Sequence, residues 1–313
     1  MESSALRSAC IRAQLVKDAA REVGFDACGI AQAAALNDDE LHLRPWLAEG
    51  CQAEMHYMEE HVEKRYDPRL LLPGAKSVIS VLLGYKPSQR MEGKAKVAQY
   101  AYGQDYHERV KGMLYRLMAA IREECPNFEA KPCVDTVPIN DRAWAVRAGL
   151  GWRGRNTLLV NPELGSYCYI GELVTTFAAD QYDSPIANGC GDCHRCVDAC
   201  PNGCLVPVEG DAYWNDARRC ASYHTIENRA ESLPEDVRLS GYAFGCDCCQ
   251  LVCPYNIRAE VCYQLSNDDK ERLESLAEAD EATFKHAAKH AALGRIKYSQ
   301  WCRNIRSIGR MPE

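Results

Sequence analysis

The 313-residue sequence contains no run of about 18 consecutive apolar residues, which excludes a conventional transmembrane helix. Its first residues, Met1 to Arg7, include neither the apolar core of a secretory signal nor a twin-arginine pair. We therefore expect a cytoplasmic protein with no membrane partner. The length is sufficient for two domains with a sizeable core.

The motifs that usually bind nucleotide phosphates are also missing. No G-x-G-x-x-G opens a helix after a strand, and there is no Walker loop. The sequence therefore gives no motif for binding flavin or nicotinamide.

An excess of positive charge is lacking as well, because the formal net charge is −7. This argues weakly against a nucleic-acid partner, although net charge hides local distribution. The segment 285–310 carries seven Lys or Arg and no acid. From composition alone, a solvated basic face is the favoured interpretation of that segment.

Cysteine, in contrast, is abundant, with eighteen residues in the chain. In a reducing compartment this number indicates metal ligation rather than disulfides. Cys190, Cys193, Cys196 and Cys200 precede Pro201 with the spacing C-x2-C-x2-C-x3-C-P. This is the spacing of a bacterial 4Fe–4S loop, in which the fourth cysteine ligates the other cluster.

A second run places Cys246, Cys249 and Cys253 before Pro254 with the same later spacings, but Ala243 stands where the opening cysteine would be. Crossed ligation then predicts two sets. The first set is Cys190, Cys193, Cys196 and Cys253. The second is Cys200, Cys246, Cys249 and one further thiolate.

Three cysteines compete for that last position. Cys220, between the runs, is the best candidate, since Cys204 follows its run too closely and Cys248 breaks the spacing. Two zinc ribbons are the alternative, but zinc usually takes paired C-x2-4-C knuckles. The pattern therefore predicts two 4Fe–4S clusters.

The sequence before the cysteine runs predicts a mixed α/β domain. Ser3 or Ser4 is expected to cap a helix that Gly24 ends. The other expected elements are strands at 25–30, 77–83, 157–160 and 167–176, and helices at 105–124, 141–149 and 267–281. We divide the chain into 1–180, 181–262 and 263–313.

Asp135 is the candidate for acid chemistry in the first domain. It follows the apolar Val134 and precedes a turn at Pro138. A carboxylate partly withdrawn from water has a raised pKa and can hold a proton near neutrality. The alternative is an ordinary turn aspartate, and the residues alone favour it.

Several short motifs together resemble the epoxyqueuosine reductase family, over about residues 10 to 310. They lie at 63–69, 72–78, 103–107, 134–136, 147–152, 165–167, 220–227 and 245–247, together with the two cysteine runs. The family also has a cysteine at the position of Cys220, in agreement with the ligand count.

The resemblance implies an α+β fold, with a nitroreductase-like cobalamin-binding domain fused to a ferredoxin-like domain that holds two 4Fe–4S clusters. It implies that Asp135 is the proton donor and lies at the cofactor. It further suggests five residues as cobalamin neighbours, namely Arg65, Leu159, Ile170, Ser222 and Asp247.

The reaction implied by the resemblance is the reduction of epoxyqueuosine to queuosine at the wobble position of a tRNA with a GUN anticodon. Two electrons from an external low-potential donor would pass through the clusters to cobalamin. A monomer is expected.

The chain departs from the family pattern in three ways. Many members continue into a helical-repeat domain, which a short form ending soon after 301–304 would lack. Cys204 stands where alanine is common, and Gln99 where arginine is frequent. Without the repeat domain, the basic segment 285–310 is predicted to contact tRNA phosphates through Lys297, Arg303 and Arg306.

Two other functions compete with this one. Another cytoplasmic corrinoid iron–sulfur reductase, similar to the dehalogenases, is the first, but those enzymes are typically exported with a twin-arginine signal. A two-cluster ferredoxin-type electron carrier is the second, but it needs neither an acid like Asp135 nor a large second domain.

Overall fold

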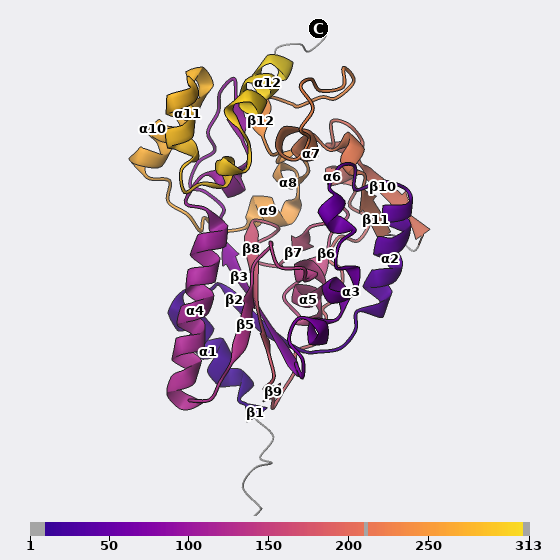
Figure 1. Cartoon of the computed structure of the whole chain (residues 1–313), viewed down its shortest axis with the longest axis vertical. Helices are drawn as coiled ribbons and strands as arrows, with labels where there is room; N and C mark the ends of the chain where they lie inside the picture. The colour runs from indigo at the N-terminus through magenta and orange to yellow at the C-terminus, as the bar shows by residue number, and fades with distance from the viewer. Residues whose placement is uncertain (1–9, 210–211, 309–313) are drawn as a thin grey trace, which may run out of the picture.

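A four-stranded antiparallel sheet is the centre of the computed structural model, which describes residues 10–209 and 212–308 (Figure 1). Its strand order is β2-β3-β8-β5. The strands are β2 (Ala27–Gln32), β3 (Ser77–Gly84), β8 (Cys168–Thr175) and β5 (Ala130–Cys133). All eight residues of β3 are buried, as its continuous apolar sequence predicted.

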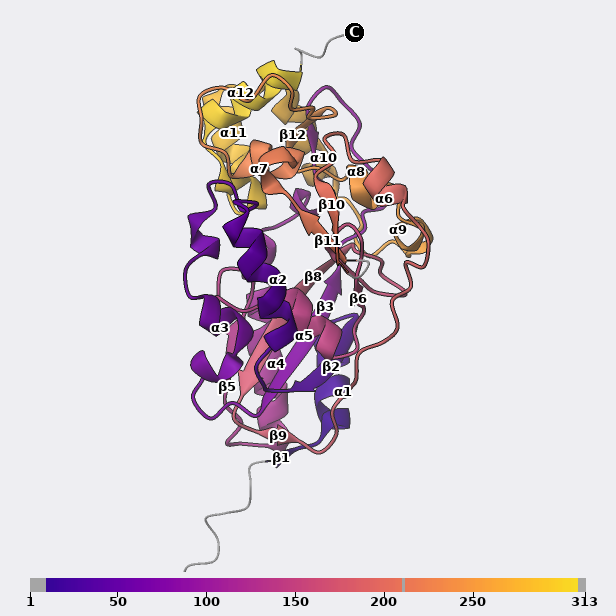
Figure 2. The ribbon, with the colours of Figure 1, turned by 90° about the vertical axis from the view of Figure 1, so that its right-hand side faces the viewer.

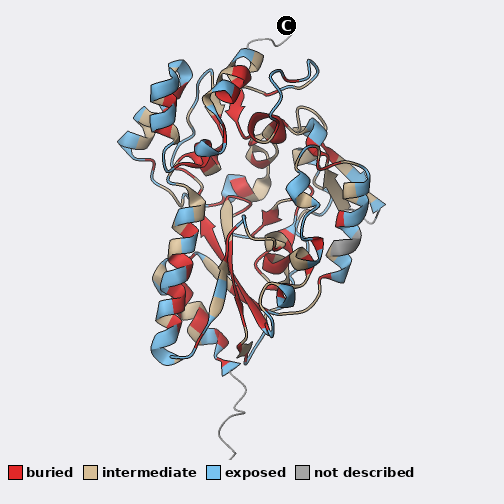
Figure 3. Ribbon diagram, viewed as in Figure 1, coloured by how far each residue is buried: buried red, intermediate tan, exposed pale blue. Residues whose placement is uncertain are grey.

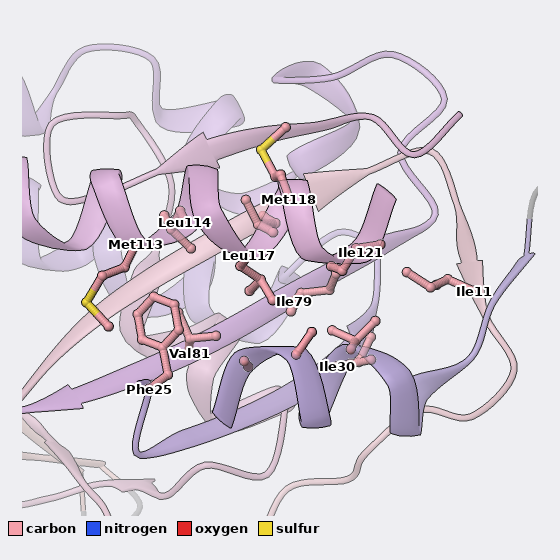
Figure 4. Packing of buried hydrophobic residues seen from close by; sticks show 14 of the residues in the cluster. Ile11, Phe25, Ile30, Ile79, Val81, Met113, Leu114, Leu117, Met118 and Ile121 are labelled. Carbon is pink, nitrogen blue, oxygen red and sulfur yellow. The ribbon is translucent and has the colours of Figure 1, made fainter. Parts of the chain in front are cut away.

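Two helices, α1 (Ala13–Val23) and α4 (Tyr106–Glu124), cover one face of this sheet. Leu117 and Ile121 of α4 pack against Ile79 and Val81 of the sheet (Figure 4). Figure 3 shows the result as a buried stripe on α4 with an exposed outer face. Spacings of three and four between apolar residues produce such a stripe in a helix.

Within the described residues, the first helix begins later than predicted. Cys10–Ile11 form a short strand, β1, which pairs in parallel with β9 (Ala178–Ala179), and α1 begins only at Ala13. Ser3 and Ser4, the expected caps, lie outside the described residues. Gly24 ends α1 as expected, because it adopts φ +99°, which favours glycine.

The other face of the sheet is covered by α2 (Asn37–Ala48), α3 (Val62–Tyr66) and α5 (Asp141–Arg147). Asn140 caps α5 by accepting a hydrogen bond from the Ala143 amide. The hairpin of β6 (Trp152–Arg153) and β7 (Leu159–Val160) follows. The strands expected at 157–160 and 167–176 are both present in shorter form, but they belong to different sheets.

A separate core lies at the C-terminal end of the molecule. There β4 (Lys96–Val97) pairs in parallel with β12 (Tyr242–Phe244). Around this pair pack α10 (Asn267–Ser275), α11 (Glu281–Ala288) and α12 (Tyr298–Ile308), with Trp301 fully buried. Residues before 105 and after 263 therefore share one core, and the three-part division of the chain stays a prediction.

The cysteine-rich segment consists of short elements between these two cores. They are α6 (Arg195–Asp198), β10 (Leu205–Val208), β11 (Ala212–Asn215), α7 (Ala221–Ile226), α8 (Cys248–Leu251) and α9 (Pro254–Arg258). Figure 2 shows α6, α8 and α9 gathered on one side of the molecule. Within the described ranges, no helix is both long and apolar enough to cross a bilayer.

A buried polar network fastens α8 and α9 to the loop before β8. The Ser166 amide donates to Asn256 Oδ1 at 2.6 Å, and the Ser166 hydroxyl donates to Gln250 Oε1 at 2.9 Å. Asn256 Nδ2 donates back to the Gln250 carbonyl at 2.8 Å. Gly165 adopts φ +61°, and a Cβ there would overlap Asn256. Only glycine therefore permits this approach.

Arg303, one of the three residues predicted to contact tRNA, is instead a buried structural residue of α12. Its guanidinium donates to the carbonyls of Asn228, Ala230 and His224 at 2.9, 2.7 and 2.9 Å. Arg306, one turn further, is exposed. The prediction that Arg303 contacts phosphate is therefore wrong, because its donors are used inside the protein.

Replacing Arg303 should consequently destabilise the fold. Arg303→Met leaves buried carbonyls without donors, and we expect a loss of about 3 kcal/mol in unfolding free energy. Urea denaturation followed by circular dichroism measures this. Arg306→Met is the matched control and should change stability by less than ~0.5 kcal/mol. Equal stability of the two variants would contradict the structural role.

Candidate active site and cluster region

The first predicted ligand set is brought together at one end of α6. Cys196 lies in α6, and Cys253 caps α9, whose first residue is Pro254. Burial raises the pKa of the Cys196 thiol to about 11, and the neighbouring Cys190, Cys253 and Cys193 contribute to the rise. A cysteine of the second run therefore lies beside three of the first. Trp152 Nε1 donates to Cys190 Sγ at 3.3 Å.

The second set gathers around Cys249 in α8. Burial raises the pKa of Cys249, and Cys220 and Cys200 are among the charges that act on it. Cys246 lies close to both Cys249 and Cys248. The spare thiol of Cys204 lies 3.3 Å from Cys200 Sγ. Cys204 and Cys248 are thus spatial neighbours of this set as well.

The chemistry of these side chains fits iron–sulfur clusters. All eighteen cysteines are free thiols, and the eight predicted ligands are all partly buried. In the described part of the chain, no three His, Cys, Asp or Glu side chains are grouped as ligands of a single metal ion. A 4Fe–4S cubane is a larger body, with one thiolate at each iron, so its ligands stand further apart.

Asp135 lies in the loop after β5, next to a histidine that sequence reasoning did not select. Its Oδ2 is 3.0 Å from His107 Nε2. The other ring nitrogen, His107 Nδ1, is 2.7 Å from Asp105 Oδ1, and the same carboxylate caps α4 through the His107 amide. Asp135 adopts φ +44°, a conformation that strains a non-glycine residue. The result is a carboxylate–imidazole–carboxylate row.

In this row the positive charge is favoured on His107 and the negative charge on Asp135. Hydrogen bonding to Asp135 raises the pKa of His107, and Asp105 adds to the rise, against the opposing effect of burial. For Asp135, withdrawal from water is the largest single effect and raises the pKa. The hydrogen bond and charge of His107, with a hydrogen bond from Tyr106, together outweigh it, so the pKa of Asp135 is lowered.

The expectation that Asp135 itself holds a proton near neutrality is therefore wrong. Its side chain is 55% exposed, and the imidazole beside it favours the carboxylate. The contact between the two side chains favours a proton on His107 and a carboxylate at Asp135.

The charge of Asp135 raises the pKa of two residues from distant segments, Tyr57 and Arg295. Arg295 donates to both oxygens of Glu227 at 3.0 and 2.9 Å. Burial raises the pKa of Tyr57 to about 12, and Glu227, Arg295 and Asp135 all act on this phenol. The family motifs at 103–107 and 220–227 contain His107 and Glu227, whereas no sequence signal identified Tyr57.

The five suggested cobalamin neighbours come from both halves of the structure. Leu159 and Ile170 belong to the cluster of apolar residues beneath α5. Ser222 follows Cys220 at the start of α7. Asp247, at the start of α8, is buried and accepts hydrogen bonds from the Gln99 amide and from the Gln99 and Gln250 side chains. Burial raises the pKa of Asp247 to about 6.

Arg65 completes this group from α3. Its Nη2 donates to the Tyr57 carbonyl at 2.7 Å. Its Nε is buried and has no hydrogen-bond partner among the described residues. A buried donor without an acceptor fits a site that receives a polar group from a bound molecule.

Comparison with known proteins finds matches over most of the chain. A family model described as "Epoxyqueuosine reductase QueG, DUF1730" matches residues 65–136, and one described as "4Fe-4S double cluster binding domain" matches 189–256. The epoxyqueuosine reductase of Cyclobacterium marinum is 38% identical over 310 residues, covering 94% of this chain and 96% of that protein. That of Gloeobacter violaceus is 40% identical, covering 93% and 94%.

This chain belongs to the epoxyqueuosine reductase family. The prediction of the family is confirmed, and the chain is an oxidoreductase with a 4Fe–4S double cluster binding domain. The interpretation as a mere electron carrier is thereby set aside.

Solved structures show the same fold. The epoxyqueuosine reductase of Streptococcus thermophilus superposes with a TM-score of 0.82 at 30% identity, covering 94% of this chain and 79% of that one. A crystal structure of an epoxyqueuosine reductase with a tRNA-Tyr epoxyqueuosine-modified stem loop gives a TM-score of 0.79 at 28% identity, covering 94% and 80%. The mixed α+β fold of this family is therefore confirmed.

The row of Asp105, His107 and Asp135 leads to a measurable titration. We expect His107 to titrate above its ordinary pKa of about 6.5, and Asp135→Asn to lower that pKa because its largest raising cause is removed. Nuclear magnetic resonance of the imidazole in the wild type and in the variant measures both. Because the folded pKa is raised, this histidine stabilises the protein fully below about pH 6.5, and the contribution is lost as pH rises through the folded pKa. An unaltered His107 titration in Asp135→Asn would contradict the coupling.

Proposed function

We propose that this protein reduces epoxyqueuosine to queuosine at the wobble position of a tRNA with a GUN anticodon. Family membership supports the substrate, and a relative of similar structure has been crystallised with an epoxyqueuosine-modified tRNA stem loop. The observation that carries the proposal is the row of Asp105, His107 and Asp135 in the same molecule as two groups of cysteines. Anaerobic turnover of such a stem loop, read by nucleoside mass spectrometry, tests it.

The proposed redox part uses eight cysteines and five further residues. One cluster is assigned to Cys190, Cys193, Cys196 and Cys253, and the other to Cys200, Cys220, Cys246 and Cys249. Cobalamin is assigned to Arg65, Leu159, Ile170, Ser222 and Asp247, where the unpartnered Arg65 Nε can donate to it. When bound, the clusters pass single electrons from an external low-potential donor, and cobalamin supplies the reducing metal centre.

Side chains of the protein deliver the protons that the reaction consumes. Opening an epoxide to an alkene consumes two electrons and two protons and releases water. As the oxygen departs, the Asp135 carboxylate relays to it the proton of His107 Nε2, 3.0 Å away, and the second proton follows the same route once His107 has been reprotonated. Asp105 holds the imidazole through Nδ1 and stabilises its charged form. A proton from solvent then restores His107.

Removing the acid should stop turnover without disturbing the cofactors. Asp135→Asn keeps the shape of the side chain but cannot deliver an acidic proton, so we expect a rate loss of about 10²–10⁴. His107→Gln should slow the reaction less and displace the pH profile. Iron, cobalamin and single-turnover rate are measured on the same preparation.

A turn-stabilising role predicts a different outcome for the same variants. Asp135→Asn would then lose stability or cofactor while its activity per intact molecule stayed near that of the wild type. A fully loaded variant that turns over at the wild-type rate would remove Asp135 from the reaction.

The ligand assignment predicts about eight iron atoms per chain. Cys220→Ala should lose about half of this iron, because it removes one of four thiolates from one cluster. Cys248→Ala is the matched control from the same neighbourhood and should retain all of it. Iron loss from Cys248→Ala with none from Cys220→Ala would reverse the assignment, and stoichiometric zinc would reject it.

The basic segment remains a candidate tRNA surface once Arg303 is excluded. Lys285, Lys289 and Lys297 line a hollow of about 810 Å³ over α11 and α12, with Phe284 in its lining. Only Lys285 among them forms an ion pair that the structure describes, with Glu281 at 2.7 Å. Such lysines can neutralise phosphates and release counterions.

Replacing Lys285, Lys289 and Lys297 together by Gln should weaken stem-loop binding and reduce its salt dependence, by up to about one unit of slope for each lost contact. Arg12, Arg116 and Lys131, around the four-stranded sheet, form a charge-matched control triple. Binding measured at several salt concentrations distinguishes the two. Equal slopes for both triples would show that the lysines are only a solvated face.

A further inference from the structure

One buried thiol of the cysteine-rich segment has no place in the ligand count. Cys204 is 5% exposed and immediately precedes β10. Its carbonyl accepts a hydrogen bond from the Asp216 amide at 2.8 Å, which anchors it to the start of the next turn. Neither the crossed sets nor the proton chemistry uses this side chain.

Cys204 contacts one proposed ligand of the second cluster. Its Sγ lies 3.3 Å from Cys200 Sγ, and its backbone amide donates to the same Cys200 sulfur at 3.3 Å. Both the side chain and the amide of Cys204 therefore meet a single ligand sulfur.

This geometry suits a donor better than a ligand. The set of Cys200, Cys220, Cys246 and Cys249 already supplies one thiolate for each iron of a cubane. A thiol S–H is a donor, whereas a ligating thiolate sulfur is an acceptor. The turn at 200–203 holds the Cys204 amide against the Cys200 sulfur, so the whole residue points its donors at that sulfur.

Hydrogen bonds to cluster sulfurs alter the reduction potential. The reduced cluster carries one more negative charge than the oxidised one, so donors directed at its sulfurs stabilise the reduced form and raise the potential. In the other proposed set, Trp152 donates to Cys190. On Cys200, Cys204 contributes an amide and a thiol from a single residue.

We propose that Cys204 is a non-ligating thiol that tunes the cluster held by Cys200, Cys220, Cys246 and Cys249, raising its reduction potential through hydrogen bonds to the sulfur of Cys200. This inference rests on the ligand set proposed above. It assigns Cys204 a positioning and electrostatic role toward the cluster, with no contact to substrate.

The test compares Cys204→Ala and Cys204→Ser with the wild type, and uses Cys125→Ala as a control for loss of a partly buried thiol near the end of α4. Iron and sulfide are determined on each anaerobic preparation. Each cluster's potential is then measured by redox titration followed by electron paramagnetic resonance.

All four proteins should contain about eight irons. In Cys204→Ala the ratio of reduced to oxidised cluster at a fixed potential should fall about tenfold, which is ~59 mV for one electron. Cys204→Ser keeps a hydroxyl donor and should stay near the wild type. Cys125→Ala should match the wild type.

Two results would overturn the proposal. A Cys204→Ala protein with eight irons and an unchanged potential shows that the contact has no electrostatic effect. A Cys204→Ala protein that loses about half of its iron shows that Cys204 is a ligand. The underlying ligand set fails in a different measurement, since the wild type would then lack eight irons or contain zinc.

Discussion

The buried hydrogen bonds among Ser166, Gln250 and Asn256 are the constraint on which the geometry of this protein depends. These groups lie between the four-stranded sheet and the two short helices that carry Cys249 and Cys253. Helices of four and five residues are too short to be stable alone. Their positions are therefore set by tertiary contacts, and polar groups removed from water are costly unless every one is paired. A network of this kind fixes both distance and orientation.

The same network reaches the proposed cofactor site. Gln250 donates to Asp247, which also accepts two hydrogen bonds from Gln99 in the segment that pairs with the C-terminal core. A single set of buried amides thus connects the sheet, the cysteine-rich helices and the residue at the start of α8. These buried contacts hold the short cysteine-bearing helices against the sheet.

The position of Asp135 depends on its backbone conformation and on its contact with His107, and not on this buried network. The loop after β5 places it at φ +44°, and the imidazole of His107 compensates for the carboxylate. Its proton affinity is therefore a property of the row and not of burial alone. A carboxylate hydrogen-bonded to a protonated imidazole can accept its proton and transfer it to a departing oxygen. Asp105 makes this possible by capping α4 and orienting the ring at once.

Local patterns in the sequence were sufficient for several elements. Continuous apolar residues predicted the buried strand at 77–83, and the helix expected at 105–124 is present as α4, which Asp105 caps. The spacing of the cysteines predicted the family of cofactor, since ligands of one cluster loop are close in sequence. The ligand count selected Cys220, in agreement with the family pattern, whereas Asp135 was selected as proton donor only by the family resemblance.

Only the tertiary structure decided what depends on residues far apart in the chain. The first helix is shorter than its apolar pattern predicts because Cys10–Ile11 pair with β9, about 170 residues away. Arg303 belongs to the interior because three carbonyls from 224–230 meet its guanidinium. The pKa of Asp135 is lowered, not raised, because α4 brings His107 beside it. Sequence determines periodicity, capping and ligand spacing, which act over a few residues. Hydrogen bonds and charges between distant segments exist only once the chain has folded.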